Sequence, residues 1–600
     1  MEERILRGKT TVIKRAKNLY SVVCLKRTSC QWISLLCICF LLWLCLKPLE
    51  VRWAEAEIIL AWGIIAISAV TGIPCILSKK LFDKSRTNCG WSWLDALIAT
   101  GTLYYVLRAW IGTEYPCAVS FLKTTEMAML YFALRSFMAK GCLSAKWIMG
   151  CLMTCTVYET GLGFSQILHG SSRHYLYLLT GTFQNPGPYS AFLMLGAVIG
   201  LTWLQESDKE WLRYIIWGAT CLMLMLLPAT WSRAAFVSLG IVLLLIFRNS
   251  YWHWRWFIWV GYIAVGVIFY FIKQGSADGR MLIWTSALTT WLHHPWMGVG
   301  IGGFFHASAN GIAEFYTNNP SSALFTSGGV TDYAFNDLLK VLVEQGIIGM
   351  FLCLSMVGYM LFLLWQHSKP LFYGMLSLLI FSMFSYPFEL LPYRIIFVMV
   401  AAWVASVHSQ QSDDRVRYGW LVLPLLLILP SYLITKQIQT RYNADRAYQM
   451  FAGMQNEAFV KDYYELLPLE YDNPRFLFDF GKTLRTHGRY NDSNDMLRQG
   501  TLVSADPMFY VLMGNNYKDM GYPDLAEESY KKAFSIMPNR IYPLYLLMQL
   551  YKETGNSKKA KEYAKKVVSF HEKIISPATK QMKEEAKSLI YTEFGTNEIQ

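Results

Sequence analysis

The sequence predicts an all-α fold: a polytopic helical membrane protein of about 12 to 13 transmembrane helices, followed by a helical solenoid. Three observations support this prediction. Of the 600 residues, 54% are hydrophobic and only 16% are charged. The apolar residues gather in blocks of about 17 to 25, the length that an α-helix needs to cross a bilayer. After about residue 440 these blocks stop, and the pattern becomes that of a soluble helical protein.

The N-terminus, residues 1–30, is basic and precedes the first apolar block. No small-residue cleavage site follows that block, so we expect an uncleaved first span and not a signal peptide. Lysine and arginine then gather in every second loop, as in "KKLFDKSR", "DKEWLR" and "DDRVR". The positive-inside rule places these loops in the cytoplasm together with the N-terminus. An odd number of spans therefore puts the C-terminal region on the far side of the membrane.

The membrane domain is expected over residues 31–437. Each span is predicted from an apolar block, and the expected spans are roughly 31–48, 56–77, 93–111, 117–138, 146–168, 188–204, 211–229, 233–247, 255–272, 338–365, 371–386, 393–408 and 419–435. Between two of them lies a large loop of about 273–335, which the span count also places on the far side.

Charge and cysteine content exclude several classes of function. The net charge of +13 at pH 7 comes mostly from the cytoplasmic loops, so it indicates orientation in the membrane and not nucleic-acid binding. All 13 cysteines lie before residue 354, mostly within apolar blocks. They form neither a disulfide framework nor a paired CxxC motif, so we expect no metal site.

The region 438–600 has an internal repeat. Gly488, Gly521 and Gly555 recur at intervals of 33 and 34 residues, with Ala526, Ala533 and prolines at matching positions. This pattern resembles the tetratricopeptide repeat, a helix pair that stacks into a short solenoid. We expect about three units between a leading helix near 443–466 and a closing helix near 577–591. Such solenoids bind peptides or proteins; packing on the membrane domain or dimerisation are the alternatives.

Two arginines at the outer side are candidates for binding an anion. Arg233 in "PATWSRAAFVS" stands at the outer end of a span with no acidic residue nearby, and Arg280 in "SADGRMLIWTSAL" begins an apparent amphipathic helix in the large loop. Two guanidinium groups could grip a diphosphate bidentately. For either arginine alone, the alternative is a side chain that extends to the lipid headgroups.

Four blocks in order carry a family resemblance: "TGTFQNPGPYSAFLML", "TWSRAAFVSL", "GRMLIWTSALTTWLHHPWMGVGIGGF" and "AFNDLLKVLVEQGIIGM". Together, over about residues 180–400, they resemble the O-antigen ligase and polymerase superfamily, which includes bacterial protein O-oligosaccharyltransferases. The resemblance implies a multi-pass glycosyltransferase of the bacterial inner membrane with a cytoplasmic N-terminus and a periplasmic C-terminal domain. It implies a donor glycan on undecaprenyl diphosphate, no nucleotide sugar, no metal and no cofactor.

The acceptor is left open by this resemblance. Transfer to lipid A core would make the chain an O-antigen ligase of lipopolysaccharide biosynthesis. Transfer to a growing glycan would make it a polysaccharide polymerase, and transfer to a Ser or Thr would make it a protein O-oligosaccharyltransferase. The bilayer is the remaining partner, and the repeats suggest a protein partner.

The helix entry departs from the family pattern at one position. By resemblance, Asn336, Glu344, Gly346 and Gly349 keep the family spacing, but Phe335 stands where many members have histidine. Phenylalanine cannot accept a proton, so another group must act as base or the enzyme must rely on diphosphate stabilisation. The candidates are Asp332, which we prefer, Asp337 and His306.

The expected mechanism is in-line displacement at the anomeric carbon with inversion, because the sequence offers no covalent nucleophile. Arg233 and Arg280 would stabilise the leaving diphosphate. Asp332 and Asn336 complete the expected catalytic set. The expected substrate-binding residues are Gln184, Asn185, His306 and Glu344. For "QNPGP" the alternative is an ordinary loop-to-helix junction.

Two other classes of function stay open. A lipid-glycan transporter would show polar or broken helices at the bilayer midplane, whereas the polar residues here cluster on one side. A membrane-tethered scaffold would act through its repeats and would not need Arg233 and Arg280.

Overall fold

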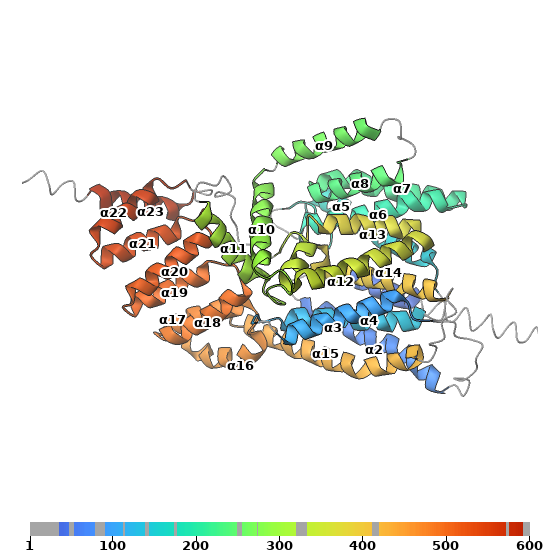
Figure 1. Cartoon of the computed structure of the whole chain (residues 1–600), viewed down its shortest axis with the longest axis horizontal. Helices are drawn as coiled ribbons and strands as arrows, with labels where there is room; N and C mark the ends of the chain where they lie inside the picture. Colours follow the sequence, from blue (N-terminus) through green and yellow to red (C-terminus); the bar gives the residue numbers. More distant parts are fainter. Residues whose placement is uncertain are drawn as a thin grey trace, which may run out of the picture. The chain divides into compact units, whose positions relative to one another are not determined.

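A computed structural model describes residues 35–46, 53–77, 90–111, 114–138, 143–172, 177–248, 255–272, 274–319, 333–410, 419–571 and 575–591. All of the regular elements in these ranges are helices, which confirms the all-α class (Figure 1). The helices divide between two compact units, which are described in turn.

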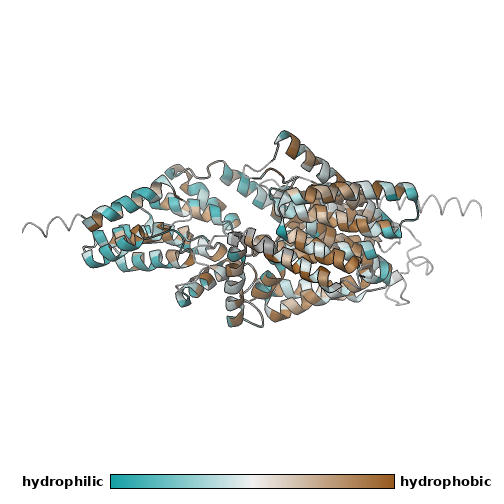
Figure 2. Ribbon diagram, turned by 90° about the horizontal axis from the view of Figure 1, so that it is seen from above, coloured by the Kyte–Doolittle hydropathy of each residue, from teal (hydrophilic) through white to brown (hydrophobic). Residues whose placement is uncertain are grey.

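The first unit comprises Met1–Thr100, Lys123–Arg255 and Leu354–Ile438. Its helices, whole or in part, are α2 (Trp53–Leu77), α3 (Trp93–Trp110), α4 (Ala118–Met138), α5 (Ala145–His169), α6 (Pro186–Glu206), α7 (Glu210–Leu226), α8 (Arg233–Ile246), α12 (Asp337–His367), α13 (Lys369–Ser382), α14 (Leu391–Gln410) and α15 (Gly419–Gln449), with 3-10 turns at Leu227–Thr230 and Pro387–Glu389. Hydrophobic residues dominate these helices in Figure 2.

Helix α6 is the centre of this unit. It packs against α5, α7, α8 and α13, and 83% of its apolar stretch is buried. Glycines allow the close approach of neighbouring helices, since a Cβ on Gly196 would lie 2.5 Å from the Thr156 hydroxyl and a Cβ on Gly200 would lie 2.1 Å from the Thr220 hydroxyl. Close contact through small residues is how helices pack where the surroundings are as apolar as the core.

Four helices in the described ranges are long and apolar enough to cross a membrane: Pro186–Glu206, Glu210–Thr230, Asp337–His367 and Leu391–Ser409. Shorter apolar helices lie at Leu35–Leu46, Arg233–Ile246 and Lys369–Ser382. Each overlaps a span expected from the sequence. The full count of about 12 to 13 spans stays a prediction.

The second unit comprises Gly101–Leu122, Trp256–Cys353 and Gln439–Gln600. It shares α3, α4, α12 and α15 with the first unit and adds α9 (Arg255–Ile272), α10 (Gln274–His293), α11 (Phe304–Asn318), a 3-10 turn at Glu457–Phe459, α16 (Val460–Glu470), α17 (Pro474–Thr486), α18 (Tyr490–Val503), α19 (Met508–Asp519), α20 (Pro523–Ile536), α21 (Tyr542–Glu553), α22 (Ser557–Val568) and α23 (Pro577–Tyr591).

The solenoid consists of the helix pairs α17–α18, α19–α20 and α21–α22. The three periodic glycines stand at the turns within the pairs, with φ of 73° at Gly488, 81° at Gly521 and 74° at Gly555. This left-handed conformation ends a helix at little cost only when the residue is glycine. The 33- and 34-residue spacing is therefore a spacing of turns, and it predicted the helix pairs correctly.

The expected leading helix at 443–466 was wrong. Helix α15 continues from the last apolar block to Gln449, and α16 begins only at Val460. Gly453, with φ of 77°, lies in the turn between them. The expected closing helix at 577–591 is confirmed as α23. The domain boundaries at about residues 30 and 437 stay predictions.

Candidate functional site

The entry of α12 is built around Asn336. Its side-chain oxygen accepts a hydrogen bond from the Leu339 amide at 3.0 Å, and its carbonyl accepts one from the Lys340 amide at 3.1 Å. Asn336 is therefore the N-cap of the helix, and Asp337 in the first turn adds a favourable charge at the positive end of the helix dipole. Asn336 and Asp337, two of the polar residues at this helix entry, thus stabilise the N-terminus of the helix.

Phe335 precedes the cap in a left-handed conformation, with φ of 51°. The guanidinium carbon of Arg280 lies 5.2 Å from the centroid of the Phe335 ring, within the range of a cation–π contact. Arg280 lies on α10, which begins at Gln274 and not at Arg280 as expected. Arg280 and Phe335 are therefore neighbours, although they are 55 residues apart in the sequence.

A small hydrophobic core holds the elements that carry these two residues. It joins α10, α11 and the first turns of α12, and its buried members are Ile283, Ala287, Phe304, Ala307, Ala334, Leu339 and Val343. Phe335 packs against this core. In the described part of the large loop expected at 273–335, α10 and α11 are helical, and α11 was not predicted.

Helix α12 is broken at Gly346, where φ is 66° and ψ is −166°. At the break, the segment 295–300 supplies the backbone hydrogen-bond partners that the helix lacks. The Val299 and Gly300 amides donate to the Val343 and Glu344 carbonyls. The Ile347 and Ile348 amides donate to the Pro295 and Trp296 carbonyls. A Cβ at Gly346 would lie 2.2 Å from the Trp296 carbonyl oxygen. Only glycine fits such a backbone conformation and such a close approach.

Side chains from α3 complete the hydrogen bonding at the break. The Tyr104 hydroxyl donates to the Gln345 carbonyl at 2.8 Å, and Arg108 donates to the Gly298 carbonyl at 3.3 Å. Both residues lie within the span expected at 93–111, and the sequence indicated this role for neither. The glycine run "GVGIGG" was the available signal, because it permits this close backbone contact.

Glu344, an expected substrate-binding residue, lies two positions before the break. It is 6% exposed, so its carboxylate is enclosed within this unit. Its backbone carbonyl accepts the Gly300 amide at 3.0 Å. The Glu344 backbone therefore helps to stabilise the break in α12.

His306 lies on α11 and contacts the solenoid. Its Nδ1 is 2.8 Å from the Thr501 carbonyl oxygen, and its Nε2 is 2.8 Å from the Asn310 side-chain amide. Asn310 in turn accepts a hydrogen bond from the Lys532 ammonium at 2.7 Å. Burial lowers the pKa of Lys532. Both ring nitrogens of His306 therefore take part in this series of hydrogen bonds, which connects α11 to α18 and α20.

Three expected residues belong to the first unit. Arg233 is the half-buried first residue of α8, separated by two residues from the 3-10 turn Leu227–Thr230. Asn185 is the N-cap of α6, and its side chain accepts a hydrogen bond from the Gly187 amide at 2.8 Å. Gln184 beside it is exposed. The "QNPGP" motif thus forms the helix junction that the sequence allowed as the alternative.

Of the expected site residues, the structure brings Arg280 to Phe335, which directly precedes the N-cap Asn336. Asp332 lies outside the described residues. Among the residues that are described, no three His, Cys, Asp or Glu side chains group as metal ligands. The arrangement offers one guanidinium beside an aromatic ring at a helix N-terminus, a combination suited to an anion.

Two family models match the chain. One, described as O-Antigen ligase, matches residues 218–354, and the other, described as tetratricopeptide repeat, matches residues 509–540 and 543–572. No curated protein matches. The first match covers Arg233, Arg280, Phe335 and Asn336, whereas the "TGTFQNPGPYSAFLML" block lies outside it. The predicted resemblance is confirmed, and with the apolar helices it indicates a membrane protein.

Proposed function

We propose that this chain, which matches the O-Antigen ligase and tetratricopeptide repeat models, transfers a glycan from undecaprenyl diphosphate to an acceptor hydroxyl. The reaction would take place at the periplasmic face of the bacterial inner membrane. The observation that carries the proposal is Arg280, which lies within the matched domain and beside the capped entry of α12.

In the proposed reaction the acceptor oxygen attacks the anomeric carbon of the first sugar. The bond from that carbon to the diphosphate breaks, undecaprenyl diphosphate leaves, and the acceptor proton passes to a base. Arg280 and Arg233 stabilise the charge that grows on the diphosphate, and each such contact is worth roughly 3 kcal/mol in a transition state. The anomeric configuration is inverted by this single displacement.

The base is proposed to be a carboxylate. Phe335 cannot take the proton, and the two ring nitrogens of His306 are engaged with Thr501 and Asn310. Asp332 is therefore the preferred base, and Asp337 is the alternative. Gln184, Asn185 and Glu344 are proposed to position substrate, with the amide nitrogen of Asn185 as donor because its oxygen caps α6.

The ligase type is favoured because the matching model is described as O-Antigen ligase. A polymerase and a protein O-oligosaccharyltransferase use the same donor and differ in acceptor. The repeats support a protein partner, because stacked helix pairs offer an extended surface for peptides. A transporter or a scaffold remains the more distant alternative.

Deletion of the gene tests the proposal and identifies the acceptor. Loss of capped lipopolysaccharide would indicate a ligase, loss of long-chain polymer a polymerase, and loss of a glycoprotein a protein glycosyltransferase. Complementation with the wild type should restore the product, and the Arg233→Ala and Arg280→Ala variants should not. The exposed Arg213→Ala variant is the matched control. Restoration by both test variants would contradict the catalytic assignment.

A further inference from the structure

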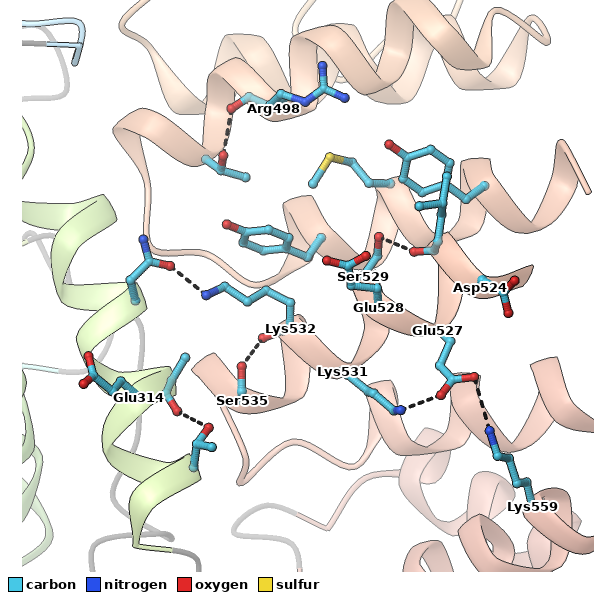
Figure 3. Close-up of a pocket in the computed structure, with 18 residues that line it drawn as sticks. Glu314, Arg498, Asp524, Glu527, Glu528, Ser529, Lys531, Lys532, Ser535 and Lys559 are labelled. Carbon is cyan, nitrogen blue, oxygen red and sulfur yellow. Dashed lines mark hydrogen bonds and ion pairs between the residues drawn. The ribbon is translucent and has the colours of Figure 1, made fainter. Parts of the chain in front are cut away.

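A cavity of about 1140 Å³ lies between α11 and the solenoid (Figure 3). It is lined by α11 on one side and by α18, α19, α20 and the first turn of α22 on the other. It exceeds the usual volume of a small-molecule site, roughly 300 to 1000 Å³, so it has room for a ligand of several units.

Polar contacts hold the walls of this cavity in place. Glu527 forms ion pairs with Lys531 and Lys559, and Asn310 accepts a hydrogen bond from Lys532, as the dashed lines of Figure 3 show. A lining fixed in this way is prepared to bind without the cost of ordering many side chains.

The charges of the lining balance. Four acidic and four basic side chains face the cavity, namely Glu314, Asp524, Glu527, Glu528, Arg498, Lys531, Lys532 and Lys559. A phosphate-rich ligand would need a clear excess of positive charge, and an apolar peptide would need a mostly apolar wall. Balanced donors and acceptors suit a ligand whose groups both donate and accept hydrogen bonds.

Aromatic rings give the cavity a second feature. The half-buried rings of Tyr510 and Tyr517 are part of the lining, together with the Leu525 side chain. A tyrosine offers a flat apolar face and a polar hydroxyl at once. A sugar ring has the matching character, since its C–H faces are apolar and its rim carries hydroxyl groups.

The cavity is connected through α11 to the candidate active site. Phe304 and Ala307 at the start of α11 pack in the core that holds Phe335, and Ala313 farther along lines the cavity. A chain bound in the cavity therefore contacts the helix that follows α10, which carries Arg280.

From this geometry we propose that the cavity is a second glycan-binding site, which holds uncharged sugar units of the chain that is transferred or extended. The inference rests on the proposed function and names a subsite for its substrate. The glycan of the lipid-linked donor and a glycan acceptor share this chemistry, and the test below separates them.

The decisive variant is Thr317→Trp. Thr317 is an exposed residue of the cavity wall, so a tryptophan there would fill the space without disturbing a buried core. Asn318→Trp is the matched control, because Asn318 is exposed on the same helix and is not part of the lining. Asp524→Asn with Glu528→Gln keeps the shape and removes two acceptor charges.

Binding should be measured on the full-length protein in lipid nanodiscs by calorimetry. The probes are the oligosaccharide released by mild acid from the cell's lipid-linked donor, and the oligosaccharide of the acceptor. We expect Thr317→Trp to weaken binding of one of them at least tenfold, the double variant to weaken it severalfold, and Asn318→Trp to leave it unchanged. The probe that is affected identifies the source of the glycan.

Two results would overturn the inference: unchanged binding of both oligosaccharides by Thr317→Trp, or Thr317-dependent binding of a peptide and of neither oligosaccharide. The proposed function is tested separately by transfer from the lipid-linked donor. If the wild type binds the oligosaccharide in the cavity but transfers nothing, the proposed function fails and the binding site stands. If transfer occurs but oligosaccharide binding does not depend on the cavity, the proposed function stands and the second glycan-binding site is ruled out.

Discussion

The guanidinium carbon of Arg280, on α10, lies 5.2 Å from the centre of the Phe335 ring, at the entry of α12. The ring attracts the cation through its negative face and limits the conformations of a long side chain. Phe335 thus orients the group proposed to hold the diphosphate. It is a positioning residue, and a separate carboxylate would supply the base.

Replacing Phe335 by leucine should lower the transfer rate by about 2- to 30-fold, because a cation–π contact is worth roughly 0.5 to 2 kcal/mol. Phe335→Tyr keeps the ring and should stay within about twofold of the wild type. The measurement is the initial rate against donor concentration. Full activity of the leucine variant would show that the ring does not position Arg280.

Phe335→His should fold. The residue has a φ of 51°, a conformation that histidine adopts several times more often than most residues with a side chain. We therefore expect a melting temperature equal to that of the wild type or a few degrees higher, measured in detergent by intrinsic fluorescence. Aggregation on size exclusion would mean that Phe335 is a packing residue of the small core that histidine cannot replace.

Gly346→Ala should disrupt the broken helix. The added Cβ would meet the Trp296 carbonyl oxygen at 2.2 Å, and alanine avoids the local φ of 66°. We expect a loss of at least about 3 kcal/mol of stability or failure to fold, together with loss of transfer. Gly358→Ala in the same helix meets no atom within 4 Å and should be tolerated. Equal stability and equal transfer rates of the two variants would contradict the break in α12 at Gly346.

Glu470, the last residue of α16, should make the C-terminal helical region less stable as the pH rises toward 7. Burial raises its pKa to about 7 from 4.5, with Asp445 and Asp472 adding to the effect and the Asn473 hydrogen bond opposing it. Because the folded pKa lies above the unfolded value, stability is full below pH 4.5 and falls as the pH rises to about 7. The loss is on the order of 3 kcal/mol.

The Glu470→Gln variant should remove this dependence. It should melt at a higher temperature than the wild type at pH 8 and at a similar one near pH 5. Glu465→Gln on the same helix is the control, because its side chain is 64% exposed. A wild type and a Glu470→Gln variant that lose stability in parallel between these pH values would contradict the assignment.

The sequence predicted the elements whose pattern is local. The apolar blocks predicted the apolar helices of the first unit, and Gly488, Gly521 and Gly555 predicted the turns of the solenoid. It missed α11, since helices in a long polar loop depend on packing that comes from elsewhere in the chain. It also placed a helix across Gly453, where a glycine in a left-handed conformation stops it.

At the candidate site, the resemblance of the sequence to the family singled out Asn336. The preference of asparagine for N-cap positions explains its hydrogen bond to the Leu339 amide. The contact of Arg280 with Phe335 could not be derived, because it depends on how α10 and α12 pack. The hydrogen bond between His306 and Thr501 could not be predicted for the same reason. The sequence around a histidine does not show whether its ring acts as a base or forms a structural hydrogen bond.

The most direct test of the central claim is the rate of glycan transfer by the purified full-length protein from a labelled undecaprenyl-diphosphate-linked oligosaccharide to the acceptor found by gene deletion. The account predicts transfer by the wild type and a fall of about 100- to 1000-fold for Arg280→Ala. Arg280→Lys should recover part of the rate, and the exposed Arg540→Ala control should match the wild type. A wild-type rate for correctly folded Arg280→Ala would contradict the account.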